Sequence, residues 1–568
     1  MTVWIFPPVG TNYGRETVHL TLPAVPEFSS VIGTIDELYF QAALPIFHMH
    51  SISSIDVFEN FQRACENNLI TIEWVPSSVT KDYCAHFLTL LKEVASTNSL
   101  EAWKKFAIWP WLILHSSGSA SLPAKLVRSR LDLWAAGDFV SLIHALPSLP
   151  RSRASNTSAQ EVARRHKRVE RELQNGYFSK AFSTLTSTSP IAEPSPETLE
   201  ALQELHPPAP VGGDFLLELP QDFPTILSSE VETALSKLPR GKSPGMTGMR
   251  FEFLKLAYSV SGDEFIQALT QMVNAFASAR LPSAVPPLFA SSRLIPLTKS
   301  GGGIRPIAMA DSFRKLVAKI IATRLTNPFL TLLRPHQYRI ALRGGLETLT
   351  TELSIDVDHT QADVVISLDA KNAFNTLSGT VIKQRIQEAN LVEFIPYMHC
   401  MYGTPSRLFC KGTGRNPLFS STGVQQGDPL GPAAFCVGIH KTLAAVALQH
   451  PDVRLYAYLD DIYVAGDMNS ALTAVASLIS SLAEIGLVIN KAKSRVLRCH
   501  NVSLDDLRNQ VAALTEDEPA EHGVVGDNHT LTICDDGLVI VGVPLGLHSS
   551  SGTFCTNKWR NGLVSLSA

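Results

Sequence analysis

Residues 455–466, LYAYLDDIYVAG, decide the fold. Aromatic and β-branched residues lie on both sides of two adjacent aspartates, Asp460 and Asp461, which predicts a strand, a tight turn at the acidic pair and a returning strand. Adjacent carboxylates repel unless cations lie between them, and hard divalent ions such as Mg²⁺ prefer oxygen-rich sites of this kind. An acidic surface turn would give the same pattern, because aspartate is a favoured turn residue. The rest of the chain must decide between the two.

The composition is that of an ordinary folded protein, but the charge is unevenly spread. The chain has 568 residues, of which 45% are hydrophobic and 18% charged, and its net charge is −4. Residues 237–343 carry 16 Lys and Arg against 4 Asp and Glu, whereas residues 499–540 carry 9 Asp and Glu and a single Arg. The regional charge therefore allows a nucleic-acid partner that the average would argue against.

The cysteines and the apolar segments indicate where in the cell the protein is expected. The 8 cysteines are scattered without a Cys-x-x-Cys pair, which indicates reduced thiols in an intracellular protein and leaves a nuclear location open. The N-terminus lacks the basic flank and apolar core of a signal peptide. The longest apolar run, residues 106–114, is too short to span a bilayer. We therefore expect no membrane association.

Composition shifts divide the chain into five regions. Residues 1–150 show helical spacing and a small tryptophan core, and residues 151–212 combine a basic helix with a Pro- and Ser-rich linker at 187–210. The basic helix suits a phosphate backbone and a solvated face equally well. The signals become dense from about Phe215, and we expect the remaining boundaries at 213–345, 346–546 with an acidic insert at 499–540, and 547–568.

Two basic segments lie in the region 213–345. Residues 292–299 and 303–308 predict two strands joined by a glycine tip, with Lys299 and Arg305 beside it. Two cations on such a tip suit a triphosphate, although a plain basic hairpin would look the same. The helix that follows, 312–325, has an apolar side that leaves its cations for solvent or nucleic acid: Arg314, Lys315, Lys319 and Arg324.

Further polar signals follow predicted strands and loops. Residues 363–369 predict a buried strand that ends in Asp369, a common way to present a metal ligand. Residues 423–432 form a Gly- and Pro-containing loop, which includes Gln426, ahead of an apolar helix at 433–448. Lys493 lies in the polar segment after residues 485–489.

Taken in order, these segments resemble the reverse transcriptases of non-LTR retrotransposons, and among them the site-specific, early-branching type. The resemblance runs from about Phe215 to Gly546. It consists of six ordered blocks: Lys-Ser-Pro-Gly at 242–245, Arg-Pro-Ile at 305–307, Asp369 with Ala373-Phe374, Gln-Gly-Asp-Pro-Leu at 426–430, Tyr-Leu-Asp-Asp at 458–461 and Gly-Leu-x-x-Asn-x-x-Lys-Ser at 486–494.

The resemblance implies an α+β fold with right-hand polymerase fingers (213–345) and a palm (346–546) with an antiparallel sheet, preceded by a mostly helical N-terminal region. It implies an RNA-directed DNA polymerase that uses two Mg²⁺ ions, or Mn²⁺, with an RNA template, a DNA primer and dNTPs as partners. The roles it implies are metal binding by Asp369, Asp460 and Asp461, proton donation by Lys493, nucleotide binding by Lys299, Arg305 and Gln426, and a primer grip at 542–546.

Phe374 separates two kinds of polymerase. In the resembling family an aromatic residue five positions after the first metal aspartate blocks a ribose 2′-hydroxyl, whereas viral RNA-dependent RNA polymerases usually place a polar residue there. Phe374 therefore favours deoxynucleotides, and simple core packing of its ring does not exclude that role.

Two other functions stay open. Such proteins commonly also carry Cys/His fingers ahead of the polymerase and a thumb and an endonuclease after it. We expect none of these here, because the sequence shows neither Cys/His set and residues 547–568 look like a truncated tail, too short for a thumb. A catalytically inactive, nucleic-acid-binding remnant is therefore the alternative. A splicing-assistance protein ranks behind it, because no RNA-binding extension is found.

Overall fold

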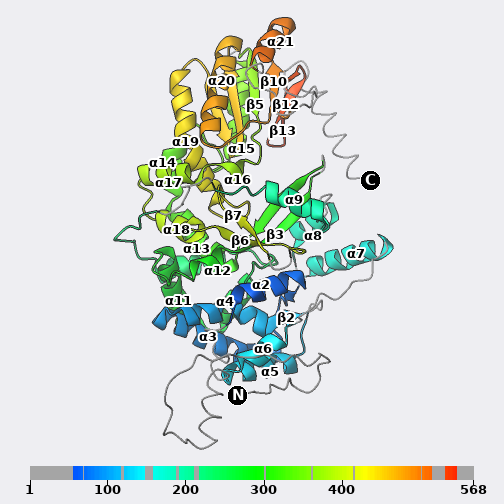
Figure 1. The fold of residues 1–568 in the computed structure, drawn as a ribbon, viewed down its shortest axis with the longest axis vertical. Helices are drawn as coiled ribbons and strands as arrows, with labels where there is room; N and C mark the ends of the chain where they lie inside the picture. The colour runs from blue at the N-terminus through cyan, green and yellow to red at the C-terminus, as the bar shows by residue number, and fades with distance from the viewer. Residues whose placement is uncertain are drawn as a thin grey trace, which may run out of the picture. The chain divides into compact units, whose positions relative to one another are not determined.

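The computed structural model describes residues 55–546, apart from 68, 117–120, 147–157, 175, 187–190, 210–216, 300–301, 360–361, 414–415, 500–501 and 515–530. The expected tail at 547–568 lies outside the described residues. The fold mixes helices with sheets and has a helical N-terminal region, as expected (Figure 1).

The N-terminal helices begin at polar caps. Asp56 accepts hydrogen bonds from the amides of Phe58 and Glu59 at the start of α2, and Ser99 accepts one from Ala102 at the start of α4. The elements of this region are α2 (Val57–Glu66), β1 (Ile70–Thr71), η3 (Ser77–Val79), α3 (Thr80–Thr97), α4 (Leu100–Leu114), β2 (His115–Ser116), α5 (Ala124–Ala135) and α6 (Phe139–His144).

The tryptophan core of this region extends beyond it. The buried ring of Trp103 on α4 lies 5.6 Å from the ring of Phe289 and 5.7 Å from that of Phe313. Helix α3 packs along α11 (Phe251–Ala277). Aromatic burial of this size dominates core energetics. The N-terminal helices therefore share one core with the next region, whose helices are α10 (Ser228–Ser236), α11 (Phe251–Ala277), α12 (Pro286–Ala290), α13 (Ser312–Arg324) and α14 (Thr326–Leu333).

The linker predicted at 187–210 is wrong for residues 196–204, which form a helix. Ser195 caps a helix, α9 (Pro196–Glu204), which begins with Pro196 and buries Leu202 completely beneath a sheet. Proline and serine serve here as helix-start residues, and composition alone cannot distinguish this use from a linker.

The basic helix is α7 (Ser158–Gln174), and it packs against α8 (Phe178–Thr186). Several cations of α7 and α8 bond groups of the same two helices. Arg165 donates to the carbonyl of Thr184, and Arg168 donates to the buried Glu172 at 3.0 Å. Lys180 of α8 lies 3.6 Å from the same carboxylate. The contacts of Arg165 and Lys180 thus hold the helix pair together, while Arg168 bonds within α7, so these cations serve packing within the protein.

A four-stranded sheet carries the basic hairpin. Its order is β4-β3-β6-β7, with β3 parallel to β6 and the other pairs antiparallel. The strands are β3 (Ser292–Thr298), β4 (Ile304–Met309), β6 (Ser406–Phe409) and β7 (Leu418–Ser420). The predicted hairpin therefore forms, and Leu297 pairs with Arg305 next to the tip.

A five-stranded sheet carries the acidic hairpin, in the order β11-β10-β5-β9-β8. Three neighbouring pairs are antiparallel, as expected, but β11 is parallel to β10. The predicted acidic insert at 499–540 therefore supplies an edge strand of the sheet as well as helix α21 (Leu504–Ala513). The strands are β5 (Val364–Leu368), β8 (Arg454–Tyr458), β9 (Asp461–Gly466), β10 (Arg495–Arg498) and β11 (Thr532–Cys534).

Helices cover this sheet, and α20 (Met468–Glu484) packs on β5 and β9 (Figure 1). A separate hairpin, β12 (Gly537–Ile540) and β13 (Val543–Gly546), adds Leu538, Ile540 and Leu545 to the core under the sheet. The remaining helices are α15 (Gly345–Asp358), α16 (Ala373–Thr376), α17 (Gly379–Glu388), α18 (Ile395–Tyr402), α19 (Gly431–Gln449), α20 (Met468–Glu484) and α21 (Leu504–Ala513).

Helix α19 is long and apolar enough to cross a membrane by length and composition, and the bent pair of α13 and α14 passes the same test when taken as one segment. In this fold α19 packs against α17, α20 and β8. A buried helix in the core of a large protein has the same apolar composition.

Candidate active site

The acidic pair lies at a two-residue turn. Tyr458 pairs with Asp461, so that Leu459 and Asp460 form the turn and Asp461 is already the first residue of β9. Leu459 has a φ of 61°, which is the positive φ that the first residue of a type II′ hairpin turn requires. The predicted hairpin is thus confirmed, with its turn centred one residue earlier than the acidic pair.

Asp369 meets the turn from the neighbouring strand. It directly follows β5, in which Leu368 pairs with Ile462 of β9. Continuing this antiparallel register by one residue brings Asp369 opposite Asp461. The sheet therefore gathers at one edge three carboxylates, those of Asp369, Asp460 and Asp461.

The three carboxylates interact electrostatically. Burial raises the pKa of Asp369 and of Asp460, and the charge on Asp369 raises that of Asp460 further. Burial and then the charges on Asp460 and Asp369 raise the pKa of Asp461 to about 6. Mutual repulsion of this kind means that the site favours a bound cation over three bare carboxylates.

The segment that carries Lys493 wraps around the backbone of Asp369. The amide of Asn490 donates to the carbonyl of Asp369 at 2.6 Å. The amide of Asp369 donates to Oγ of Ser494 at 3.1 Å, and this buried hydroxyl donates in turn to the carbonyl of Asn490 at 2.9 Å. The charge on Lys493 lowers the pKa of Asp369 against the effect of burial, so Lys493 lies near the acidic edge.

Asn490 and Ser494 are supporting residues that the sequence analysis did not single out. Both belong to the Gly-Leu-x-x-Asn-x-x-Lys-Ser block. Asn490 and Ser494 are four residues apart, a spacing at which the serine hydroxyl can bond back to the asparagine carbonyl. This spacing is the sequence signal from which the turn could have been predicted.

The cations of the β3–β4 tip reach the same edge. Burial, and then the charges on Lys493 and Arg305, lower the pKa of Lys299, while the charge on Asp369 opposes the change. The charge on Arg305 also lowers the pKa of Asp460 against the effect of burial. The structure therefore brings Lys299, Arg305 and Lys493 together around the carboxylates.

Phe374 and the loop before α19 lie against each other. The ring of Phe374 is 8% exposed and stacks on Phe435 of α19, with 4.8 Å between the ring centroids. The carbonyl of Phe374 accepts a 2.6 Å hydrogen bond from Val424, and a Cβ on Gly423 would lie 2.2 Å from that carbonyl oxygen. Only glycine allows this approach, which fixes the loop to Phe374.

The backbone of Gln426 is hydrogen-bonded to the four-stranded sheet. Its carbonyl accepts a hydrogen bond from the amide of Ala308 on β4 at 2.7 Å. Gly427 has a φ of 122°, and a Cβ there would lie 2.1 Å from the carbonyl oxygen of Ala308. Gln426 is partly exposed and lies against the strand that carries Arg305.

A buried ion pair that the sequence analysis missed supports this loop. Arg314 was expected to face solvent or nucleic acid, but its guanidinium is buried and lies 2.6 Å from the carboxylate of Asp428. Tyr397 and Tyr402 donate to the same carboxylate at 2.7 and 2.5 Å. Arg324, also expected to be free, pairs with Glu230 and Glu393, so the prediction is wrong for both arginines.

The turn of the β12–β13 hairpin contacts Tyr463 on β9, the strand that begins with Asp461. Tyr463 is buried, its pKa is raised mainly by burial and by the charge on Asp461, and a backbone hydrogen bond with Val541 opposes that rise. Val541 and Gly542 form the hairpin turn. The segment predicted as a primer grip, 542–546, therefore comprises half of this turn and the strand after it.

The carboxylates form a partial ligand set for a metal ion. Within the described ranges, no group of three His, Cys, Asp or Glu side chains is already placed to hold a metal. Hard divalent cations at phosphate-handling sites commonly use one or two carboxylates and take their other ligands from water and phosphates. The donor set at this edge fits such a cation.

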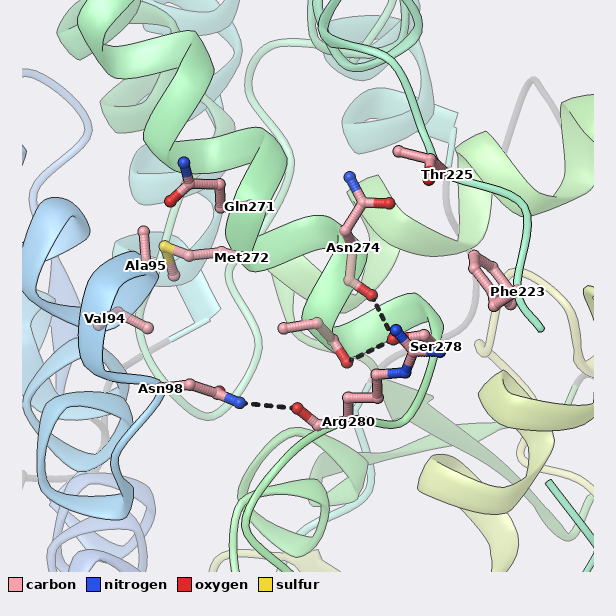
Figure 2. A pocket seen from close by; sticks show the side chains of 11 residues that line it. Val94, Ala95, Asn98, Phe223, Thr225, Gln271, Met272, Asn274, Ser278 and Arg280 are labelled. Carbon is pink, nitrogen blue, oxygen red and sulfur yellow. Dashed lines mark hydrogen bonds between the residues drawn. The ribbon is translucent and has the colours of Figure 1, made fainter. Parts of the chain in front are cut away.

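A cavity of about 420 Å³ lies elsewhere, between the ends of α3 and α11. Figure 2 shows Asn98 donating to the carbonyl of Arg280, and Ser278 bonded to the carbonyls of α11. None of the predicted site residues lines this cavity. It is separate from the acidic edge.

Comparisons with known proteins agree with the resemblance. The family model described as reverse transcriptase (RNA-dependent DNA polymerase) matches residues 297–520, a range that contains all the predicted site residues. The Transposon TX1 uncharacterized 149 kDa protein of Xenopus laevis is 28% identical over 298 residues, which cover 49% of this chain and 22% of that protein.

Two other relatives give similar values. The Retrotransposable element SLACS 132 kDa protein of Trypanosoma brucei gambiense is 25% identical over 286 residues, 49% of this chain and 24% of its own length. The Retrovirus-related Pol polyprotein from type-1 retrotransposable element R2 of Popillia japonica is 24% identical over 208 residues, 34% of this chain and 29% of its own length. The matches thus span less than a third of each relative.

Proposed function

This chain carries a reverse transcriptase domain of the non-LTR retrotransposon type, and on that premise we propose that it is an RNA-directed DNA polymerase. It would transfer a nucleotide from a dNTP to the 3′-hydroxyl of a DNA primer on an RNA template. The observation that carries the proposal is the convergence of Asp369 with the Asp460–Asp461 turn at one sheet edge, where the charges of Lys299, Arg305 and Lys493 act on the carboxylates. In this assignment the five-stranded sheet is the palm and the β3–β4 hairpin belongs to the fingers.

Asp369, Asp460 and Asp461 would hold two Mg²⁺ ions, with Mn²⁺ as a substitute. Burial raises the pKa of all three carboxyls, and the charges of neighbouring aspartates raise those of Asp460 and Asp461 further. A divalent cation would relieve both the burial of the charges and their repulsion. Such a pair of ions stabilises the attacking and leaving oxygens of an in-line displacement. The protein's part is to fix the carboxylates, which the β5–β9 register and the contacts of Asn490 and Ser494 to Asp369 do.

Lys299 and Arg305 would bind the triphosphate. They lie beside a glycine tip and close to the carboxylates, so that both can reach phosphates held there. Lys493, which lies beside Asp369, would supply a proton or a positive charge to the departing pyrophosphate.

Phe374 and Gln426 would contact the sugar and the base-paired nucleotide. The loop that carries Gln426 is bonded to Phe374 on one side and to β4 on the other, so both residues have fixed positions relative to Arg305. A rigid aromatic edge at this place would exclude a 2′-hydroxyl by contact alone.

The test is primer extension by the full chain on an RNA template with dNTPs or NTPs. The proposal predicts templated dNTP incorporation, and it predicts that Lys299→Ala raises the KM for dNTP by about tenfold, because one charge-assisted phosphate contact is lost. Lys81→Ala, an exposed lysine on α3, is the matched control. Binding of template and primer without incorporation would instead favour an inactive, nucleic-acid-binding remnant.

A further inference from the structure

The catalytic turn contains an unfavourable backbone conformation. Leu459 has a φ of 61°, and residues other than glycine, asparagine and aspartate seldom adopt this left-handed region, because Cβ crowds the backbone. Leu459 directly precedes Asp460 and is two residues from Asp461. A turn that relaxed to a negative φ at Leu459 would redirect both carboxylates.

A buried glutamine from another part of the chain holds this residue. Oε1 of Gln337 accepts a hydrogen bond from the amide of Leu459 at 2.8 Å, and Nε2 of Gln337 donates to the carbonyl of Leu459 at 3.3 Å. Gln337 is 1% exposed. A buried amide side chain needs hydrogen-bond partners within the protein, and the Gln337 amide finds two of them in the N–H and C=O groups of Leu459.

The backbone beside Gln337 fixes its position relative to the turn. The amide of Ala457 donates to the carbonyl of His336 at 2.7 Å, and the amide of Tyr338 donates to the carbonyl of Ala457 at 2.9 Å. Gln337 thus pairs in parallel with Ala457 on β8, two residues before Leu459. The side chain cannot shift along the strand without breaking these bonds.

We propose that Gln337 is a positioning residue of the active site: it holds Leu459 in its left-handed conformation and so sets the positions of Asp460 and Asp461. The inference rests on the proposed function, since it assumes that these two carboxylates are the metal ligands. Gln337 touches neither nucleotide nor metal in this account. It acts only through the turn.

The test substitutes Gln337→Met, which keeps the volume of the side chain and removes both hydrogen bonds, in the full chain. Two quantities are measured: Mn²⁺ affinity by electron paramagnetic resonance, which needs no synthesis, and the Mg²⁺ dependence of primer extension. We expect Gln337→Met to weaken Mn²⁺ binding and to lower kcat by about tenfold each, with little change in the KM for dNTP, because displaced ligands cost affinity and rate. Gln62→Met, another buried glutamine with no contact to the turn, is the matched control.

A second substitution tests whether the effect passes through Leu459. Glycine adopts a positive φ without strain, so in a Leu459→Gly background the further loss caused by Gln337→Met should shrink to about threefold or less. Circular dichroism checks that each variant is folded. This coupling is a readout that a general loss of stability would not produce.

The outcomes are distinguishable. If Asp460→Ala loses Mn²⁺ but Gln337→Met binds it like Gln62→Met, the positioning role is overturned while the metal site stands. A Gln337→Met effect of the same size in both backgrounds would also overturn it. If the parent binds no Mn²⁺, or binds it no better than Asp460→Ala does, the proposed function fails, and this inference fails with it.

Discussion

The guanidinium of Arg314 lies 2.6 Å from the carboxylate of Asp428, and both side chains are fully buried. Arg314 also donates to the side-chain oxygen of Gln425 at 3.2 Å, so the ion pair fixes the loop that carries Gln426. Burying two charges is costly, and here two tyrosine hydroxyls and a main-chain amide complete the carboxylate's hydrogen bonds. The ion pair acts on the site by giving this loop one shape.

Removing one partner of this pair should be strongly destabilising. Arg314→Met leaves the Asp428 carboxylate buried without its counter-charge, and we expect a loss of about 3–5 kcal/mol in the free energy of unfolding. Arg324→Met, whose partners are partly exposed, should cost only about 1 kcal/mol. Urea denaturation of both variants checks this, and equal losses would contradict the role assigned to the buried pair.

Truncating Phe374 should change sugar selectivity. Phe374→Ala removes the ring that we propose contacts the sugar of the nucleotide, so we expect the preference for dNTP over NTP to fall by about tenfold or more, as kcat/KM ratios. Phe329→Ala removes another buried ring, one that packs on Phe394 away from the site, and should lower stability without altering the ratio. Unchanged selectivity in an active Phe374→Ala protein would remove the gate assignment.

The raised pKa of Asp461 predicts a pH dependence of stability. Burial, and then the charges on Asp460 and Asp369, raise the pKa of this carboxyl from its ordinary value of 3.8 to about 6 in the folded protein. The folded state therefore binds the proton more tightly than the unfolded chain, and without metal the contribution of this group to stability falls as the pH rises from about 4 to about 6.

Asp461→Asn should accordingly stabilise the metal-free protein above that window, by roughly 1 kcal/mol after allowance for solvent screening. Added Mg²⁺ should reverse the order, because only the parent has this ligand to bind it. Thermal unfolding in EDTA and in Mg²⁺, at about pH 4.5 and pH 7.5, measures both effects. A parent that is more stable than Asp461→Asn at pH 7.5 in EDTA would contradict this reading.

The sequence predicted the acidic hairpin well because its signal is local. Alternating β-formers on both sides of Asp460 and Asp461 specify strands, and the register that brings Asp369 to them follows from pairing two such strands. The basic hairpin with Lys299 and Arg305 was predictable for the same reason.

The supporting contacts were not predictable because their partners are far away in sequence. Arg314 sits on an amphipathic helix, where charged residues normally face solvent, and its partner Asp428 is 114 residues further on. Gln337 gives no sequence signal at all, since its role depends on a turn 122 residues away. The burial of Trp103 against Phe289 likewise depends on tertiary packing.

The most direct test of the central claim is primer extension on an RNA template with dNTPs and Mg²⁺, comparing the parent with Asp460→Ala. Asp452→Ala, which removes an exposed aspartate just before the hairpin, is the control for the loss of a carboxylate. We expect extension by the parent and by Asp452→Ala, and a loss of about a thousandfold or more in Asp460→Ala, with folding and RNA binding retained. A folded, RNA-binding parent that extends no primer, or an Asp460→Ala variant that extends as well as the parent, would contradict the account.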